Sequence, residues 1–430
     1  YKFKSETDTE VVPHLINYFM KKGKKFEEAV RLTTERLKGS YALAIAYVAE
    51  PDKIIAVRKE SPLILGLGKD ETLLASDIPA VLPHTKRVII LEDGEMAILS
   101  PGKAIVKRLD SGKLVKKTPM EVPWTMEMAE KRGYPHFMLK EIHEQPDAVR
   151  ETLRASAEEL DKLGRMLLDA KRVYLVACGT AYHAALVGKY ALAQLADVSA
   201  EVVISSEFQE SCMVDDGTVL LAISQSGETA DTLKAVRVAK SKGARIACLT
   251  NVVGSSITRE SEVVCHTYAG PEIGVAATKT FSAQVAYLLQ LSLHLTKKRR
   301  RISGAEFDKL VTQLSEIPEI AQKVLKEIEP LVKSIAKRYK DAPNFYFIGR
   351  GIGYPIVMEG ALKLKEIAYI HSEATPAGEL KHGPLALIER DVPVVAAVVP
   401  SASRSRMMGN VEETKARGGT IIALAAEDDL

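Results

Sequence analysis

A strand–loop–helix pattern, Val173-Tyr174-Leu175-Val176-Ala177-Cys178-Gly179-Thr180-Ala181-Tyr182, occurs near the middle of this sequence of 430 residues. A related stretch runs from Phe345 to Tyr354. The two stretches align at a constant offset of 172 residues, which pairs Tyr174 with Tyr346, Gly179 with Gly351 and Tyr182 with Tyr354. Internal similarity in a single register indicates two copies of one structural unit.

Apolar strands and helices alternate around the first copy. The pattern predicts strands at 173–177, 218–223, 245–249 and 262–267, helices that reach residues 195 and 242, and a long helix over 279–295. Parallel strands need crossover connections of this kind, so the alternation predicts a doubly wound parallel sheet. We therefore expect an α/β fold with two related domains, over residues 155–300 and 325–430.

The first 115 residues have a different pattern. Helix-period segments at 11–20 and 26–37 precede several short β-type runs, which predicts an antiparallel sheet with helices packed on it. Asp93-Gly94 predicts a hairpin turn between strands at 88–91 and 95–99. Residues 116–154 contain Pro119, Pro123 and the only tryptophan, Trp124, and are expected to form a linker, of which Tyr134–Ile142 docks between domains.

The composition argues against several classes of function. Hydrophobic residues make up 46% of the chain and charged residues 27%, as in ordinary globular proteins. No uncharged apolar run reaches about 18 residues, which argues against a membrane span. A net charge of +3 and an aromatic content of 6% argue against a nucleic-acid partner.

The cysteines indicate a reducing compartment. The four of them, Cys178, Cys212, Cys248 and Cys265, show no CxxC spacing and no accompanying histidine cluster. This argues against a structural zinc site and against a disulfide framework. No secretory signal pattern is present. We expect reduced thiols in a cytoplasmic protein.

The loop Ser224-Gln225-Ser226-Gly227-Glu228-Thr229 is the strongest candidate for ligand binding. It lies between an apolar strand and a helix, where free backbone N–H groups and the helix dipole favour an anion. The loop has no lysine and no GxxxxGK[ST] pattern, so a single phosphate on a small molecule suits it better than a nucleoside triphosphate. The alternative is an ordinary Ser-rich turn with Thr229 as a helix cap.

The loop at Cys178-Gly179-Thr180 follows a neighbouring strand and is expected at the same edge of the sheet. We expect Cys178 to be a packed residue and not a nucleophile.

Ionisable residues are concentrated in the second copy. Glu359, Lys363 and Glu366 are spaced so that they share one face of a helix. Their neighbours are glycine and apolar residues, which argues against a mere surface salt-bridge stripe. His382 follows in a loop flanked by Gly383 and Pro384, and a histidine can exchange protons near neutral pH.

These groups suit aldose–ketose chemistry on a phosphosugar. A carboxylate can take a proton from a carbon next to a carbonyl, and a histidine can shuttle the hydroxyl proton when a sugar ring opens. A lysine can hold the open carbonyl electrostatically or as a Schiff base.

The sequence closely resembles the glutamine–fructose-6-phosphate aminotransferases (isomerizing), also called glucosamine-6-phosphate synthases. The resemblance covers the whole chain. It is carried by 224–229, by Glu272-Ile273-Gly274-Val275-Ala276, by the helix 359–366 and by Gly378-Glu379-Leu380-Lys381-His382-Gly383-Pro384. It implies part of an N-terminal Ntn-type glutaminase domain (α+β) over 1–115, a linker over 116–154, and two sugar isomerase (SIS) domains with doubly wound parallel sheets over 155–300 and 325–430.

The resemblance also implies a role for each matching residue. Glucosamine 6-phosphate would be made from fructose 6-phosphate and glutamine, without a metal or an organic cofactor. The sugar phosphate would be held by Thr180, Ser224, Gln225, Ser226 and Thr229, with Val275 lining the sugar site. Lys363 would assist at the carbonyl, Glu366 would move the proton between C1 and C2, and His382 would help to open the ring. That histidine would come from the other subunit of a homodimer, and Asp77 would bind the amino group of glutamine.

The sequence departs from the family pattern in three respects. It begins at Tyr1 and has no cysteine before Cys178, whereas the family's glutaminase nucleophile is an N-terminal cysteine. The family's C-terminal Schiff-base lysine has no counterpart. We therefore expect the chain to be a synthase fragment truncated at both ends. Ala181 and Ala277 stand where many members have serine, so we expect two sugar-facing hydroxyls to be lost.

Two other functions stay open at this point. The first is a stand-alone phosphosugar isomerase, for which Glu366 and His382 would suffice, although the glutaminase-like segment argues against it. The second is a phosphosugar-binding SIS protein without catalysis, against which the Lys363, Glu366 and His382 set argues.

Overall fold

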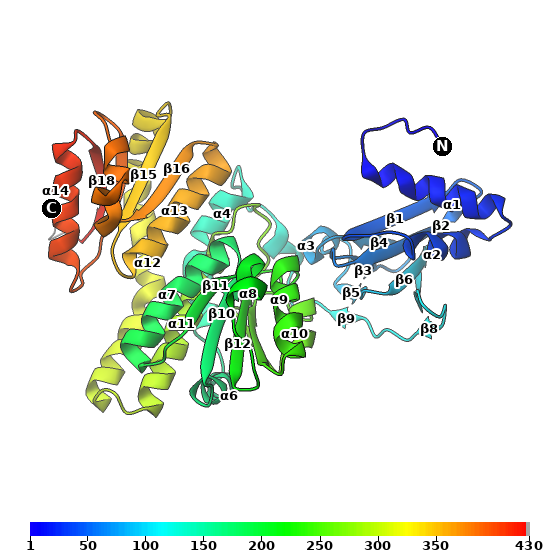
Figure 1. The fold of residues 1–430 in the computed structure, drawn as a ribbon, viewed down its shortest axis with the longest axis horizontal. Coiled ribbons are helices and arrows are strands. Elements are labelled where there is room, and N and C mark those ends of the chain that lie inside the picture. Colours follow the sequence, from blue (N-terminus) through cyan, green and yellow to red (C-terminus); the bar gives the residue numbers. More distant parts are fainter. Residues whose placement is uncertain (427–430) are drawn as a thin grey trace. The chain divides into compact units, whose positions relative to one another are not determined.

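The computed structural model describes residues 1–426. The chain divides into two compact units, Tyr1–Glu130 and Lys131–Leu430, and each is described by itself. Figure 1 shows a mainly antiparallel β architecture in the first unit and layered helices and sheets in the second.

The first unit confirms the predicted helices packed on antiparallel strands. Its helices are η1 (Asp8–Glu10), α1 (Val11–Lys21), α2 (Phe26–Thr34), α3 (Ile78–Val81) and η2 (Met126–Ala129), and its strands are β1 (Tyr41–Tyr47), β2 (Glu50–Lys59), β3 (Ile64–Leu67), β4 (Thr72–Ala75), β5 (Arg87–Ile90), β6 (Glu95–Ser100), β7 (Lys103–Arg108), β8 (Leu114–Val115) and β9 (Met120–Glu121). Val12, Ile16 and Phe19 share one face of α1 and are buried in a cluster with residues of α2, β1 and β2. Removing this stripe from water stabilises the unit.

The strands of this unit form two sheets, with the orders β1-β2-β6-β7-β8 and β4-β3-β5-β9. The predicted Asp93-Gly94 hairpin is therefore wrong, because β5 pairs with β3 and β9 whereas β6 pairs with β2 and β7. The turn carries the chain from one sheet to the other. Its Asp93 carboxylate accepts a hydrogen bond from the Glu60 N–H at 2.9 Å and lies 3.2 Å from the Arg58 guanidinium, and these contacts hold the turn at the end of β2.

The first part of the second unit contains a parallel five-stranded sheet with the order β11-β10-β12-β13-β14. The elements are α4 (Phe137–His143), α5 (Gln145–Thr152), α6 (Ala157–Leu168), β10 (Arg172–Ala177), α7 (Gly179–Ala196), β11 (Glu201–Ile204), η3 (Ser205–Glu207), α8 (Phe208–Ser211), β12 (Thr218–Ser224), α9 (Ala230–Ser241), β13 (Arg245–Thr250), α10 (Ser256–Glu260), β14 (Val263–His266) and α11 (Lys279–Lys298). The four predicted strands are confirmed. The short edge strand β11 was not predicted.

Helices cover both faces of this sheet. One apolar cluster joins β10 and β12 to α6, α7 and α11, and a second joins the same strands to α8, α9 and α10 on the opposite face. All seven residues of β12 are buried, as expected for a parallel strand covered on both sides. The predicted doubly wound arrangement is confirmed.

The second part repeats this plan with a parallel sheet of order β16-β15-β17-β18. Its elements are α12 (Gly304–Tyr339), β15 (Asn344–Gly349), α13 (Gly353–Ala368), β16 (His371–Pro376), η4 (Ala377–His382), η5 (Pro384–Leu387), β17 (Pro393–Val398), α14 (Arg404–Ala416) and β18 (Thr420–Ala425). β15 begins 172 residues after β10. Gly179 and Gly351 both have a φ of 54°, so the repeat extends to the backbone conformation of the loop.

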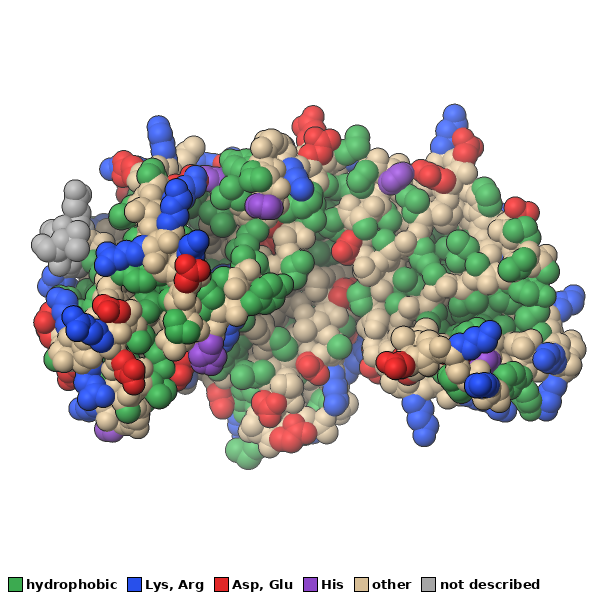
Figure 2. All heavy atoms as spheres, turned by 90° about the horizontal axis from the view of Figure 1, so that it is seen from above, with side chains coloured by type: hydrophobic (Ala, Val, Ile, Leu, Met, Phe, Trp, Pro, Cys, Tyr) green, Lys and Arg blue, Asp and Glu red, His purple; other side chains and the backbone are tan. Residues whose placement is uncertain are grey.

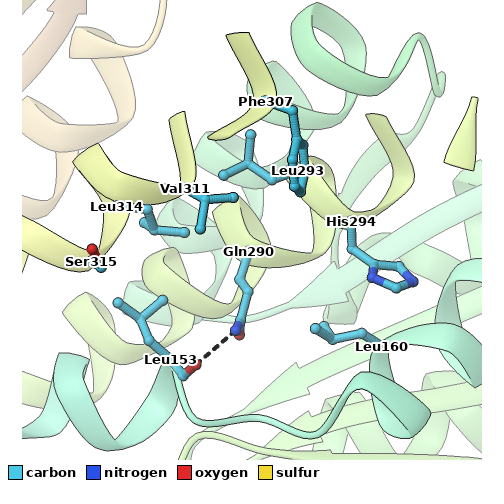
Figure 3. Close-up of a pocket in the computed structure, with 9 residues that line it drawn as sticks. All are labelled: Leu153, Leu160, Gln290, Leu293, His294, Phe307, Val311, Leu314 and Ser315. Carbon is cyan, nitrogen blue, oxygen red and sulfur yellow. Dashed lines mark hydrogen bonds between the residues drawn. The ribbon is translucent and has the colours of Figure 1, made fainter. Parts of the chain in front are cut away.

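The start of α12 packs near α5, α6 and α11 and borders an open, mainly apolar cavity of about 220 Å³ (Figure 3). Within it, the Gln290 amide donates a hydrogen bond to the Leu153 carbonyl at 2.8 Å. The cavity is lined by Leu153, Leu160, Gln290, Leu293, His294, Phe307, Val311, Leu314 and Ser315.

Acidic and basic side chains are interspersed over the face shown in Figure 2, in keeping with the small net charge. Among the described helices, none combines the length and apolar character that a membrane span requires. Within residues 1–426, no group of three or more His, Cys, Asp and Glu side chains is arranged to hold a metal ion.

Candidate active site

A cavity of about 130 Å³ lies where the strand order of the first parallel sheet reverses. β10 lies between β11 and β12, so the chain leaves β10 and β12 in opposite directions and a crevice forms beyond their carboxyl ends. A single water needs roughly 10–15 Å³, so the cavity has room for a much larger group. It is lined by Cys178, Thr180, Ala181, Ile223, Ser224, Gln225, Ser226, Thr229, Ala277, Thr280 and Gln284.

The loop after β12 is folded around its own hydroxyl groups. The Gly227 N–H donates to Ser224 Oγ at 3.0 Å, and Ser224 Oγ lies 2.9 Å from Thr229 Oγ1. Thr229 occupies the N-cap position of α9, but its side chain makes no cap hydrogen bond. The alternative of an ordinary capped turn therefore does not account for Thr229, whose hydroxyl joins Ser224 at the cavity.

Gly227 is required by the geometry of this loop. Its φ is +66°, and a Cβ at this position would lie 2.1 Å from Ser255 Oγ. The Gly227 carbonyl accepts the Ile257 N–H at 3.0 Å, and Glu228 binds the Ser256 N–H and hydroxyl at 2.7 Å each. Hydrogen bonds to the start of α10 thus fix one side of the loop, while its hydroxyl-bearing side faces the cavity.

The electrostatics of the cavity suit an anion held by neutral donors. None of the described residues that line it is lysine or arginine. The helices α7 and α9 both begin beside it, and neither start is capped by a side chain. Uncapped N-terminal N–H groups carry the positive end of the helix dipole, so these two ends supply the favourable potential for a phosphate.

A chain of contacts joins this cavity to α13 of the second repeat. Lys363 Nζ lies 3.1 Å from Thr180 Oγ1, 3.3 Å from Glu359 Oε1 and 2.5 Å from Glu366 Oε2. Thr180 Oγ1 also donates to Glu359 Oε1 at 2.9 Å. The predicted shared face of Glu359, Lys363 and Glu366 is therefore confirmed, and it points at a residue of the first repeat.

The buried end of this chain is His183 on α7. Its Nδ1 lies 2.7 Å from Glu359 Oε2, and both side chains are about nine-tenths buried. The Glu359 carboxylate is therefore contacted from two sides, by Lys363 and by His183. In contrast, the Glu366 side chain is 38% exposed, so its carboxylate is accessible from solvent.

The segment after β14 is held in place by carboxylates. Glu141 of α4 accepts the N–H groups of Ile273 and Gly274 at 2.6 and 3.0 Å, and burial raises the pKa of the Glu141 carboxyl. Glu272 accepts the N–H groups of Thr278 and Thr280 at 2.8 and 3.2 Å. Residues 131–152, predicted as part of a linker, thus pack within the second unit and position the loop that brings Ala277 to the cavity.

Two comparisons with known proteins identify the fold of the second unit. The SIS domain family matches residues 166–293 and 338–429, once on each repeat. The solved C-terminal domain of glucosamine-fructose-6-phosphate aminotransferase from Francisella tularensis is 41% identical, with a TM-score of 0.66, and the match covers 69% of this chain and 85% of that one.

The relatives match along the whole chain. A glutamine–fructose-6-phosphate aminotransferase (isomerizing) from Thermococcus kodakarensis is 48% identical over 430 residues, which is all of this chain and 71% of the relative. One from Aquifex aeolicus is 47% identical over 431 residues, covering all of this chain and 70% of the relative. The chain belongs to the glutamine–fructose-6-phosphate aminotransferase (isomerizing) family. Membership confirms the resemblance on which the functional expectations rest, and makes the chain one of a family of aminotransferases.

Most of the residues that the family resemblance assigns to sugar-phosphate binding lie together around one cavity in the structure. Thr180, Ser224, Gln225, Ser226 and Thr229 line the cavity, as do Ala181 and Ala277. Lys363 reaches the cavity through Thr180, with Glu366 beside it.

Three predicted residues lie apart from these contacts. Val275 is fully exposed, and it does not line the cavity. His382 is exposed at the end of η4. Asp77 lies in the first unit, where its carboxylate accepts the Ala80 N–H at 3.1 Å and caps α3.

Sequence reasoning did not identify His183, Thr280 or Gln284. His183 follows Thr180 by three residues, a helical spacing that places both on one face and that could have drawn attention to it. Thr280 and Gln284 share a face of α11 by the same rule. No sequence motif marked Thr280 or Gln284, because the cavity that they line is formed by three segments that are distant in the sequence.

Proposed function

We propose that this chain carries out the sugar reaction of its family. Glutamine-derived amide nitrogen is transferred to fructose 6-phosphate with ketose-to-aldose isomerisation, which gives glucosamine 6-phosphate. The observation that carries the proposal is the 3.1 Å contact between Lys363 Nζ and Thr180 Oγ1, because it joins the proton-transfer groups of the second repeat to the phosphate cavity of the first.

Each side chain has a chemical part in this proposal. The hydroxyls of Thr180, Ser224, Ser226 and Thr229, with the backbone N–H groups of the loop and the amide of Gln225, hold the phosphate. Lys363 stabilises negative charge that develops on the carbonyl oxygen. The accessible Glu366 carboxylate takes the proton from one carbon and returns it to the other. Val275, on the loop after β14, lines the sugar site.

We further propose that His382 opens the sugar ring in the active site of a partner copy within a homodimer. Its exposure supports this, as do three large exposed apolar side chains nearby in the sequence, Ile367, Tyr369 and Leu387. Exposed apolar groups of this kind often mark interaction surfaces.

The domain assignment is also part of the proposal. Residues 1–115 form part of an Ntn-type glutaminase domain, in which Asp77 binds the amino group of glutamine, and 116–154 join it to the SIS domains at 155–300 and 325–430. The antiparallel sheets of the first unit and the two parallel sheets of the second are compatible with this division.

The test is glucosamine 6-phosphate formation from fructose 6-phosphate and glutamine, measured for the full-length protein and for three variants of it. Glu366→Gln should lower the rate about 100-fold or more, and Lys363→Met should also lower it strongly. Lys365→Met is the matched control, because Lys365 is exposed on the same helix, and it should retain the wild-type rate.

Three outcomes would contradict the proposal. Full activity of Glu366→Gln would remove the proposed proton carrier. Glucose 6-phosphate formed without any dependence on glutamine would favour a phosphosugar isomerase. Fructose 6-phosphate binding without turnover would favour a binding protein.

A further inference from the structure

Gln284 lines the candidate sugar-phosphate cavity and carries a buried hydrogen-bond acceptor that is unpaired within the described residues. The residue lies on α11, is 2% exposed and lines the cavity beside Thr280. Its Oε1 atom is buried and has no hydrogen-bond partner among residues 1–426. Buried polar atoms in native proteins are nearly always bonded, so an exception calls for an explanation such as a bound group.

The chemistry of this atom differs from that of its neighbours. A phosphate takes N–H and O–H donors, which the loop after β12 and the two helix starts provide. An amide oxygen only accepts hydrogen bonds, so it cannot bind an ionised phosphate oxygen. It needs an O–H or N–H donor, and a phosphosugar carries hydroxyl groups next to its phosphate.

We propose that Gln284 is a further substrate-binding residue, whose Oε1 accepts a hydrogen bond from a sugar hydroxyl while the loop 224–229 holds the phosphate. This inference rests on the proposed function, since it takes a phosphosugar as the ligand. It makes Gln284 a specificity residue, because a ligand without that hydroxyl leaves the amide oxygen unpaired in the complex.

The chain offers a closely matched control on the same helix. Gln290 also lies on α11, and its Oε1 is also buried without a partner. Gln290 lines the separate apolar cavity of Figure 3, between α11 and the start of α12. A change at Gln290 therefore removes the same chemical group at a place that the sugar does not reach.

The experiment measures the dissociation constants of fructose 6-phosphate and of inorganic phosphate by calorimetry, for wild type, Gln284→Met and Gln290→Met. Gln284→Met should weaken fructose 6-phosphate binding about 10- to 100-fold and leave inorganic phosphate binding unchanged. Gln290→Met should leave both unchanged. Equal fructose 6-phosphate affinity in wild type and Gln284→Met would overturn the inference, as would an equal loss for both ligands.

A second measurement begins with the wild-type protein, so its first step does not depend on the folding of a variant. Monodeoxy analogues of fructose 6-phosphate are tested on the wild-type protein, and one of them should bind about 10-fold or more weakly. That analogue should lose no further affinity on Gln284→Met, as in a double-mutant cycle. If every analogue binds wild type as fructose 6-phosphate does, the inference fails. If wild type binds no fructose 6-phosphate at all, the proposed function fails first.

Discussion

Replacement of Gly227 by alanine tests two physical demands on the candidate phosphate loop 224–229, which are the backbone strain at a positive φ and the lack of space for a side chain. The comparison is with Gly179, in the loop after β10. Both glycines have positive φ, +66° and +54°, so alanine at either position has the same backbone strain, about 1–2 kcal/mol. The two sites differ in the space around the missing side chain.

A Cβ on Gly179 would meet no heavy atom within 4 Å. A Cβ on Gly227 would lie 2.1 Å from Ser255 Oγ, 2.6 Å from Ser255 Cβ and 3.0 Å from Ile257 Cγ2. The loop cannot simply move away, because the Gly227 carbonyl is bonded to the Ile257 N–H. Overpacking of this kind costs about 1–3 kcal/mol. Gly179→Ala should therefore lower the free energy of unfolding by about 1–2 kcal/mol, and Gly227→Ala by about 2–5 kcal/mol.

Urea unfolding followed by far-UV circular dichroism measures both losses. The single tryptophan, Trp124, lies in the first unit, so its fluorescence transition serves as an internal reference that neither variant should shift. Gly227→Ala should also weaken inorganic phosphate binding more than Gly179→Ala does. Equal destabilisation by the two variants would refute the reasoning, because it would show that backbone strain alone matters at Gly227.

Three further predictions concern ionisable side chains of the second unit. His183→Leu removes one partner of the buried Glu359 carboxylate and should lower kcat more than it raises KM. His183→Asn keeps a hydrogen-bond donor and should restore much of kcat. Wild-type kinetics in the leucine variant would contradict this prediction. Cys178 lines the cavity, so a thiol reagent should label it and inorganic phosphate should protect it from labelling. Cys248 should stay unlabelled in the folded protein, because burial raises the pKa of its thiol to about 11. Mass spectrometry of the labelled peptides tests both predictions. Burial also raises the pKa of the Glu159 carboxyl above its unfolded value. The contribution of this group to stability is therefore present below the unfolded pKa and is lost as pH rises through the folded pKa. Glu159→Gln should gain stability relative to wild type at neutral pH but not at acid pH, as the urea midpoints at the two pH values would show.

The repeat and its parallel sheets could be read from the chain because their signals are local. β12 is a continuous apolar run, buried on both faces, and β10 and β15 begin at the offset that aligned Tyr174 with Tyr346. The edge strand β11 escaped prediction because it has four residues of mixed burial, too few for a period to be recognised. The Asp93-Gly94 turn was misread because a turn shows that the chain bends but does not show which strands pair.

The sequence by itself determined the parallel α/β repeats, the hydroxyl-rich loop at 224–229 and the shared helix face of Glu359, Lys363 and Glu366, since each depends on residues close together in the chain. Only the tertiary structure decided that this face meets Thr180, that His183 contacts Glu359 from another helix, and that Gln284, with a buried acceptor unpaired in the described residues, lines the cavity. These contacts join segments more than 50 residues apart or across the two repeats. Their pairing depends on how sheets and helices pack, and no local pattern in the sequence encodes that packing.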